Sequence, residues 1–126
     1  MYAKSAVFLK GSIMNIQIFG SKKCNDTKKA ERFFKERGIK YQYIDMSEKG
    51  MSKGEFNAVA QANGGIESLI DQNCKDKDAL ALIKYIASED KISKILENQQ
   101  VIKTPVVRNG KQSTVGYQPD VWKKWE

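Results

Sequence analysis

The chain has 126 residues, of which 40% are hydrophobic and 29% charged, and it carries a formal net charge of +7. This length is enough to bury a hydrophobic core without disulfide staples, and the composition is that of an ordinary globular protein. No apolar run is long enough to span a membrane, and the lack of histidine excludes His-ligated metal sites and His-activated nucleophiles.

The first thirteen residues differ in character from the rest of the chain. Residues 6–9 form an apolar run that is too short for the hydrophobic region of a signal peptide. We therefore expect residues 1–13 to be an N-terminal extension, either a tag or a disordered segment. The alternative is an additional edge strand. A single domain is expected to occupy residues 14–126.

Cys24 lies in the connection between a predicted strand and the predicted helix that follows it. Residues 15–19 favour a buried strand, and residues 28–37 favour a helix whose apolar face holds Ala30, Phe33 and Phe34. At a helix N-terminus the unpaired N–H groups and the helix dipole favour an anion. Cysteines in such settings have pKa values of about 3.5–7.5. Two interpretations stay open, a reactive thiol and a small buried cysteine.

A second strand completes the first structural unit. Gly38 predicts the end of the helix, and residues 40–45 alternate as a strand rich in aromatic and β-branched residues does. A strand, a helix and a strand within this length form a βαβ unit. We therefore expect the two strands to be parallel.

The middle of the chain favours helices. Ser52 and Glu55 have the spacing of a capping box at the start of one helix, and residues 66–70 predict a short helical turn. Cys74 is expected in a polar loop over residues 71–78. Two further helices are marked by apolar residues at helical spacing, namely Ala79, Leu82, Ile83 and Ile86 in the first and Ile92, Ile95 and Leu96 in the second.

The last section predicts a hairpin and a terminal helix. Residues 104–108 and 111–115 are strand-like, Asn109-Gly110 is a strong hairpin-turn signal, and Pro105 is expected at the strand's start. A final helix opens at residues 118–120. The order β-α-β, helical insertion at about residues 52–100, β-hairpin and terminal helix predicts a thioredoxin-like α/β fold with a mixed four-stranded sheet.

Charge and cysteine usage narrow the chemistry. The two cysteines lie 50 positions apart, which forms neither a disulfide framework nor a zinc pattern and suits a reduced, cytoplasmic setting. No nucleic-acid-binding motif is present, so we expect no direct nucleic-acid binding, and we interpret the basic region as a rim that attracts anionic substrates to Cys24. Residues 22–40 hold eight basic residues (Lys22, Lys23, Lys28, Lys29, Arg32, Lys35, Arg37, Lys40) and three acidic ones (Asp26, Glu31, Glu36).

Three separated segments together resemble one known family. They are Gly-Ser-Lys-Lys-Cys-Asn-Asp-Thr-Lys-Lys-Ala at residues 20–30, Ile-Lys-Thr-Pro-Val-Val at residues 102–107 and Val-Gly-Tyr at residues 115–117. With the helical insertion between them, the chain from residue 15 to residue 125 resembles the arsenate reductase (ArsC) and Spx-type branch of thioredoxin-fold, glutaredoxin-related proteins.

The resemblance implies roles for individual residues. Cys24 would be the nucleophile that attacks an oxyanion or a disulfide sulfur. Pro105 would be a cis-proline facing it, and Thr104 would pair with bound glutathione or peptide. Lys23 and Asn25 would support substrate binding around the thiol.

The resemblance also implies a monothiol cycle. Thr27 takes the fourth position of a Cys-x-x-Thr motif, where its hydroxyl would donate to the Cys24 sulfur; the alternative is an ordinary threonine in the first turn of the helix. Cys24 would form a mixed disulfide with glutathione or a protein, and a second thiol would release it. Cys74 is a candidate resolving thiol. The alternative is an exposed loop cysteine with no task.

This chain departs from both branches of the family. Arsenate reductases place an arginine before the proline, where Thr104 stands, and another after the hairpin, at Tyr117-Gln118-Pro119. Between Arg37 and Arg108 there is no arginine, the residue whose planar fork suits an oxyanion. Spx-type regulators commonly carry Cys-x-x-Cys, which Thr27 rules out here.

Three functions are suggested by the comparison of these features. The favoured one is a thiol oxidoreductase acting through Cys24, with glutathione or glutaredoxin as its partner. The alternatives are an Spx-like, non-enzymatic regulator that binds RNA polymerase, and a genuine glutaredoxin-dependent arsenate reductase. We expect no bound cofactor, no metal, no membrane partner and a monomer, with glutathione only as a co-substrate.

Overall fold

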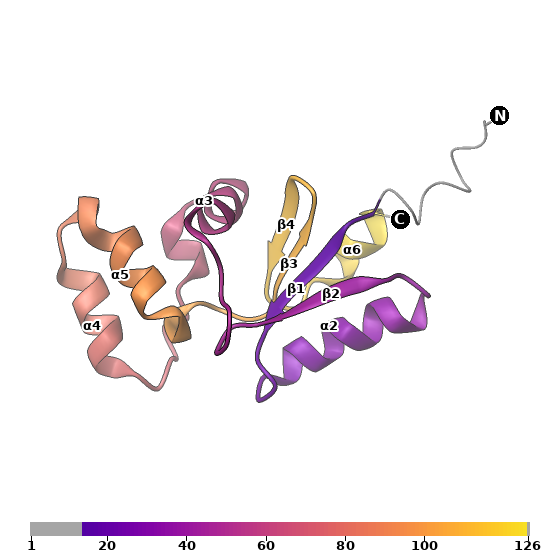
Figure 1. The fold of residues 1–126 in the computed structure, drawn as a ribbon, viewed down its shortest axis with the longest axis horizontal. Coiled ribbons are helices and arrows are strands. Elements are labelled where there is room, and N and C mark those ends of the chain that lie inside the picture. The colour runs from indigo at the N-terminus through magenta and orange to yellow at the C-terminus, as the bar shows by residue number, and fades with distance from the viewer. Residues whose placement is uncertain (1–13, 126) are drawn as a thin grey trace.

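The computed structural model describes residues 14–125 and has a four-stranded sheet at its centre (Figure 1). The expected N-terminal extension at residues 1–13, and its alternative as an edge strand, lie outside the described residues. The strands are β1 (Ile16–Gly20), β2 (Tyr41–Asp45), β3 (Val106–Asn109) and β4 (Gln112–Val115), in the spatial order β2-β1-β3-β4. β1 pairs with β2 in parallel, and the other pairs are antiparallel, so the predicted thioredoxin-like mixed sheet is confirmed.

Alternating side chains of β1 build two hydrophobic clusters, one on each face of the sheet. Ile16 and Ile18 face α2 (Asn25–Glu36) and α6 (Pro119–Trp125), where Phe34 and Trp122 are fully buried. Phe19 faces the opposite side, where the helical insertion covers the sheet. Because β1 is an interior strand with buried side chains on both faces, it is mostly apolar in sequence, and Gln17 is its one polar residue.

α2 begins three residues earlier than the sequence pattern indicated. Cys24 is its N-cap, and the Lys28 N–H donates to the Cys24 carbonyl at 3.3 Å. Residues 25–27 are Asn, Asp and Thr, which are weak in helix interiors but favourable in a first turn, where N–H groups need no helical partner. The predicted stop is confirmed, since Gly38 has a φ of 68° just beyond the helix.

The hairpin turn lies one residue later than expected. Asn109 belongs to β3, where it is in register with Ile16 on one side and Gln112 on the other. The Asn15 N–H donates to the Asn109 side-chain oxygen at 3.1 Å, which also holds this residue in the sheet. The turn therefore consists of Gly110, with a φ of 62°, and Lys111.

The insertion contains three α-helices, namely α3 (Lys53–Ala62), α4 (Lys77–Tyr85) and α5 (Lys91–Glu97), and short 3-10 turns at Ile66–Leu69, Ser88–Asp90 and Gln99–Val101. The predicted capping box is present at the start of α3. The predicted apolar face of α4 is partly wrong, because Leu82 is 45% exposed. α4 packs chiefly on α5 and buries only the narrow stripe of Ala79 and Ile83. Among residues 14–125, no helix is long and apolar enough to cross a bilayer.

One side-chain amide fastens the end of the insertion to the loop after β2. The Met51 N–H donates to Gln99 Oε1 at 2.7 Å, and Gln99 Nε2 donates to the Met51 carbonyl at 2.9 Å. Gly50 is buried with a φ of 68°, and a Cβ atom there would overlap the Gln99 amide. The glycine therefore makes room for the amide, which completes the hydrogen bonds of an otherwise unpaired backbone segment.

We expect Gln99→Leu to lower the free energy of unfolding by about 1–3 kcal/mol, because it leaves two backbone groups of Met51 without partners. Urea unfolding followed by circular dichroism measures the loss. Gln61→Leu, at an exposed position of α3, makes the same chemical change and is the control. Equal stability of the two variants would show that the amide does not fasten the insertion.

Candidate functional site

Cys24 lies at the junction of β1 and α2, half-buried. Its N–H donates to the Ser21 carbonyl at 3.0 Å, which closes the loop between strand and helix. Thr27 is buried behind it and accepts a hydrogen bond from the Ser21 N–H at 3.4 Å. A Cβ atom on Gly20 would overlap the Thr27 side chain, so this loop depends on a glycine at the end of β1.

The Cys24 sulfur is surrounded by hydrogen-bonding groups from two distant segments. The thiol donates to the Thr104 carbonyl at 3.5 Å. Partial burial by itself raises the pKa of Cys24, but hydrogen bonds from the Thr104 and Thr27 side chains and from the N–H groups of Thr27 and Asp26 outweigh it, so the pKa lies below its ordinary value. These donors favour the thiolate, which is the nucleophilic form of cysteine.

Pro105 and Thr104 stand directly before β3, opposite the Cys24 loop. Pro105 is buried, and its carbonyl accepts a hydrogen bond from the Gly116 N–H at 2.8 Å. The Thr104–Pro105 peptide bond is cis. The proline thus stands at the start of the strand, as expected from its missing N–H donor.

A cleft of about 930 Å³ opens beside Cys24, between the sheet and the insertion. This volume is within the range of ligand sites in proteins. Three lysines and four carboxylates line the cleft, and no arginine does. The charged residues are Lys23, Lys49, Lys75, Glu48, Asp71, Asp76 and Glu97.

The structure brings most of the predicted site residues together. Cys24, Lys23 and Thr104 all line the cleft, and Thr27 supports the sulfur from behind. Asn25 does not line it; its side chain is exposed in the first turn of α2. Asn25 thus lies next to the thiol in sequence but outside the cleft.

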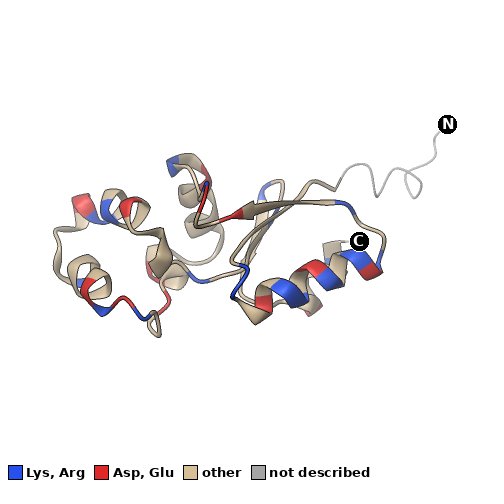
Figure 2. Cartoon of the chain, turned by 60° about the horizontal axis from the view of Figure 1, so that its bottom comes forward, with Lys and Arg blue, Asp and Glu red and all other residues tan. Residues whose placement is uncertain are grey.

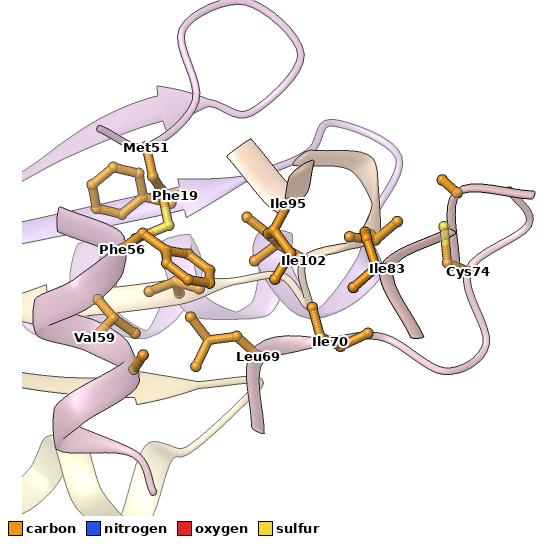
Figure 3. Packing of buried hydrophobic residues seen from close by; sticks show 14 of the residues in the cluster. Phe19, Met51, Phe56, Val59, Leu69, Ile70, Cys74, Ile83, Ile95 and Ile102 are labelled. Carbon is orange, nitrogen blue, oxygen red and sulfur yellow. The ribbon is translucent and has the colours of Figure 1, made fainter. Parts of the chain in front are cut away.

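The expectation that Cys74 is an exposed loop cysteine is wrong. Cys74 is 8% exposed and belongs to the hydrophobic cluster that includes Ile70 and Ile83 (Figure 3). Its thiol donates to the Gln100 carbonyl at 3.3 Å, and it lines the same cleft as Cys24. The loop folds inward because its backbone bonds to the segment before β3: the Asp71 N–H donates to the Val101 carbonyl at 2.8 Å.

Both thiols therefore donate hydrogen bonds to backbone carbonyls of the same short segment, residues 100–104. Cys24 contacts the carbonyl of Thr104, and Cys74 contacts the carbonyl of Gln100, four residues earlier. Four residues of extended chain span at most about 14 Å. Both cysteines are free.

The loop after β2, residues 46–50, also lines the cleft, which the sequence analysis did not predict. The Asp45 carboxylate accepts hydrogen bonds from the Ser47 hydroxyl at 2.7 Å and the Ser47 N–H at 2.8 Å. These bonds, with a smaller contribution from Lys22, lower the pKa of Asp45. Asp-x-Ser is a known turn-forming pattern, so the signal was present in the sequence. Among the residues described, no group of side chains could hold a metal ion.

Comparisons with known proteins agree on the family and the fold. The ArsC family model matches residues 19–125. The global transcriptional regulator Spx 2 of Oceanobacillus iheyensis is 25% identical over 109 residues, which cover 85% of this chain and 80% of that protein. An arsenate reductase from Vibrio cholerae superposes with a TM-score of 0.76 at 19% identity, covering 90% of this chain and 98% of the other. A Staphylococcus aureus protein gives a TM-score of 0.70 at 24% identity over 86% of this chain and 96% of its own.

We expect Thr27→Val to raise the Cys24 pKa, because it removes a hydroxyl that donates to the sulfur. The thiolate then forms at higher pH. In a Cys74→Ser background, the rate of iodoacetamide alkylation should rise along a curve displaced to higher pH. Thr114→Val makes the same atomic change at the other buried threonine of the described residues and should leave the curve in place. Superimposable curves for the Thr27→Val variant and its parent would contradict the assignment.

Proposed function

The chain belongs to the ArsC family, and from this membership we propose that it is a thiol-dependent oxidoreductase whose Cys24 forms a mixed disulfide. The observation that carries the proposal is the position of Cys24. Its sulfur has a lowered pKa, lies at the start of α2 and lines an open cleft. A buried structural cysteine would need none of these features.

The first step is thiol–disulfide exchange. The Cys24 thiolate attacks one sulfur of oxidised glutathione, the glutathione S–S bond breaks, and one glutathione thiolate leaves. The product is a disulfide between Cys24 and glutathione. A second thiol, from glutathione or glutaredoxin, then attacks this mixed disulfide and releases Cys24 as a thiolate.

The charges of the cleft support a peptide-like substrate. Lys23 stands next to the reactive thiol, and Lys49 and Lys75 lie farther along the lining. Glutathione has two carboxylates and one ammonium group. A cleft lined by both lysines and carboxylates offers a partner to each of these charges.

Two observations bear on how the mixed disulfide is resolved. Thr27 occupies the position that a second cysteine would need for a disulfide within the Cys24 turn. Cys74 lines the same cleft, and we propose it as a second thiol that can reach a disulfide bound there. A direct bond between Cys24 and Cys74 requires their Cα atoms to approach within about 7 Å.

Arsenate reduction is less well supported than disulfide exchange. Binding a tetrahedral oxyanion favours arginine, whose fork donates paired hydrogen bonds, whereas lysine supplies a point charge. The cleft has three lysines and no arginine among its lining residues. The residue beside the Cys24 sulfur is Thr104, which offers only a hydroxyl and a carbonyl.

A second candidate function is favoured by the similarity to the regulator Spx 2. In that case the chain would be a non-enzymatic protein that binds RNA polymerase, and Cys24 would be dispensable for binding. Retention of RNA polymerase by the Cys24→Ser variant, together with the absence of any thiol exchange, would replace the first proposal with this one.

We expect intact-mass analysis after incubation with oxidised glutathione to show that Cys24 of the wild-type chain has reacted, either as one glutathionyl adduct or as the internal disulfide that forms when Cys74 displaces the glutathione. Cys24→Ser should give neither product, because it lacks the nucleophile, and Cys74→Ser should keep the adduct because its cysteine is only the candidate resolving thiol. An adduct that persists in Cys24→Ser and disappears in Cys74→Ser would overturn the assignment of the nucleophile.

With arsenate, reduced glutathione and glutaredoxin, we expect the wild-type chain to give no turnover above the Cys24→Ser background, because no arginine lines the cleft. Coupled oxidation of NADPH through glutathione reductase measures the rate. Turnover that depends on Cys24 would show that lysines suffice and would make the chain an arsenate reductase.

A further inference from the structure

A second hollow lies between α2 and α6. It has a volume of about 390 Å³ and shares no lining residue with the Cys24 cleft. Four cations, one carboxylate and three apolar residues line it. They are Lys29, Arg32, Arg37 and Lys123, then Glu36, then Phe33, Tyr117 and Pro119.

The cations of α2 exceed its acids on this side. Asp26 forms an ion pair with Lys29 at 3.9 Å, and both side chains are half-exposed, so the pair contributes little. Glu31 accepts a hydrogen bond from the Tyr41 hydroxyl at 2.9 Å, on the side toward β2. Figure 2 shows basic residues along the whole length of α2. Within the described part of the chain, exposed Arg32 has no ion-pair partner, whereas Lys123 pairs with Asp120 at 3.9 Å with both side chains exposed. The cations that line the hollow therefore outnumber its one carboxylate.

Aromatic rings hold several of these cations in place. The Arg37 guanidinium stacks on the Phe33 ring at 3.8 Å from its centroid, and Lys29 Nζ lies 5.6 Å from the centroid of Tyr117. Tyr117 in turn packs edge-on against buried Trp122. A cation fixed against a ring loses less side-chain freedom when it binds a carboxylate, which favours binding.

Two exposed apolar side chains belong to this part of the chain. Tyr117, which lines the hollow, is 40% exposed, and Val121 of α6 is 38% exposed. They are two of the four large hydrophobic side chains that the described residues expose. Apolar side chains rimmed by charges are typical of protein–protein contacts.

We propose that this α2–α6 surface, formed by Lys29, Arg32, Arg37, Tyr117, Val121 and Lys123, docks an acidic segment of a partner protein. The segment places carboxylates on Arg32 and Lys123 and packs one apolar side chain against Tyr117 and Val121. A nucleic-acid backbone fits less well. Glu36 and Asp120 place negative charges among the cations, and phosphate groups would not pack against the exposed side chains of Tyr117 and Val121. The Cys24 cleft stays open while this surface is occupied.

Fluorescence anisotropy at low salt tests the proposal on the full chain. The probe is a fluorescein-labelled peptide of alternating Glu and Asp with a central Leu-Phe pair, and a peptide of Gln and Asn with the same Leu-Phe pair is the uncharged reference. We expect saturable binding of the acidic peptide only. Arg32→Glu/Lys123→Glu should weaken it at least about tenfold, since two carboxylate partners become repulsive.

The control variant is Lys77→Glu/Lys111→Glu, which changes the net charge equally at exposed positions outside this surface. It should change the affinity less than about twofold. Tyr117→Ala should weaken binding of the acidic Leu-Phe peptide by about threefold to tenfold and leave the affinity for an all-acidic peptide unchanged. Thermal unfolding of each variant verifies that it is folded.

Three outcomes would overturn the proposal. Equal weakening by the two charge-reversal variants would show attraction by net charge alone. Tighter binding of a short DNA duplex that displaces the peptide would assign the surface to nucleic acid. Absence of saturable peptide binding would show that no acidic segment docks there.

Discussion

The contact between the Cys24 sulfur and Thr104 is the interaction on which the site depends. It joins two segments that are 80 residues apart, the loop after β1 and the residue before Pro105. The antiparallel pairing of β1 with β3 brings these segments together, because the C-terminal end of β1 lies beside the N-terminal end of β3. The first turn of α2 then supplies donors to the same sulfur. The sheet therefore positions the thiol, and Thr104 together with the first turn of α2 lowers its pKa.

Local patterns predicted the parts of the fold that local physics determines. The apolar run of β1, the apolar face of α2, the stop at Gly38 and the capping box at Ser52 all arise from interactions within a few residues. Cys24 and Thr104 were predicted together only because a family resemblance linked them. No pattern within one segment indicates that a strand's end will meet a proline loop far along the chain.

The features that the sequence did not predict depend on long-range packing. Polar residues flank Cys74 in the sequence. The side chain is buried because the backbone of its loop forms hydrogen bonds with the segment before β3. Leu82 has helical spacing but is 45% exposed, since α4 buries only the stripe of Ala79 and Ile83. The two hydrogen bonds between Gln99 and Met51 join residues 48 positions apart in the sequence, and no periodic sequence pattern predicts them. Cys74 and Gln99 line the cleft, so the shape of the site was less predictable than its nucleophile.

The central claim is that the fold stabilises Cys24 as a thiolate. The ultraviolet absorbance of the thiolate, titrated against pH in Cys74→Ser and corrected with the Cys24→Ser/Cys74→Ser variant, measures this directly. The account predicts a single transition whose midpoint lies below the reference cysteine pKa of about 8.5. A midpoint at or above that value would show that burial outweighs the surrounding donors and would contradict a reactive thiol at this site.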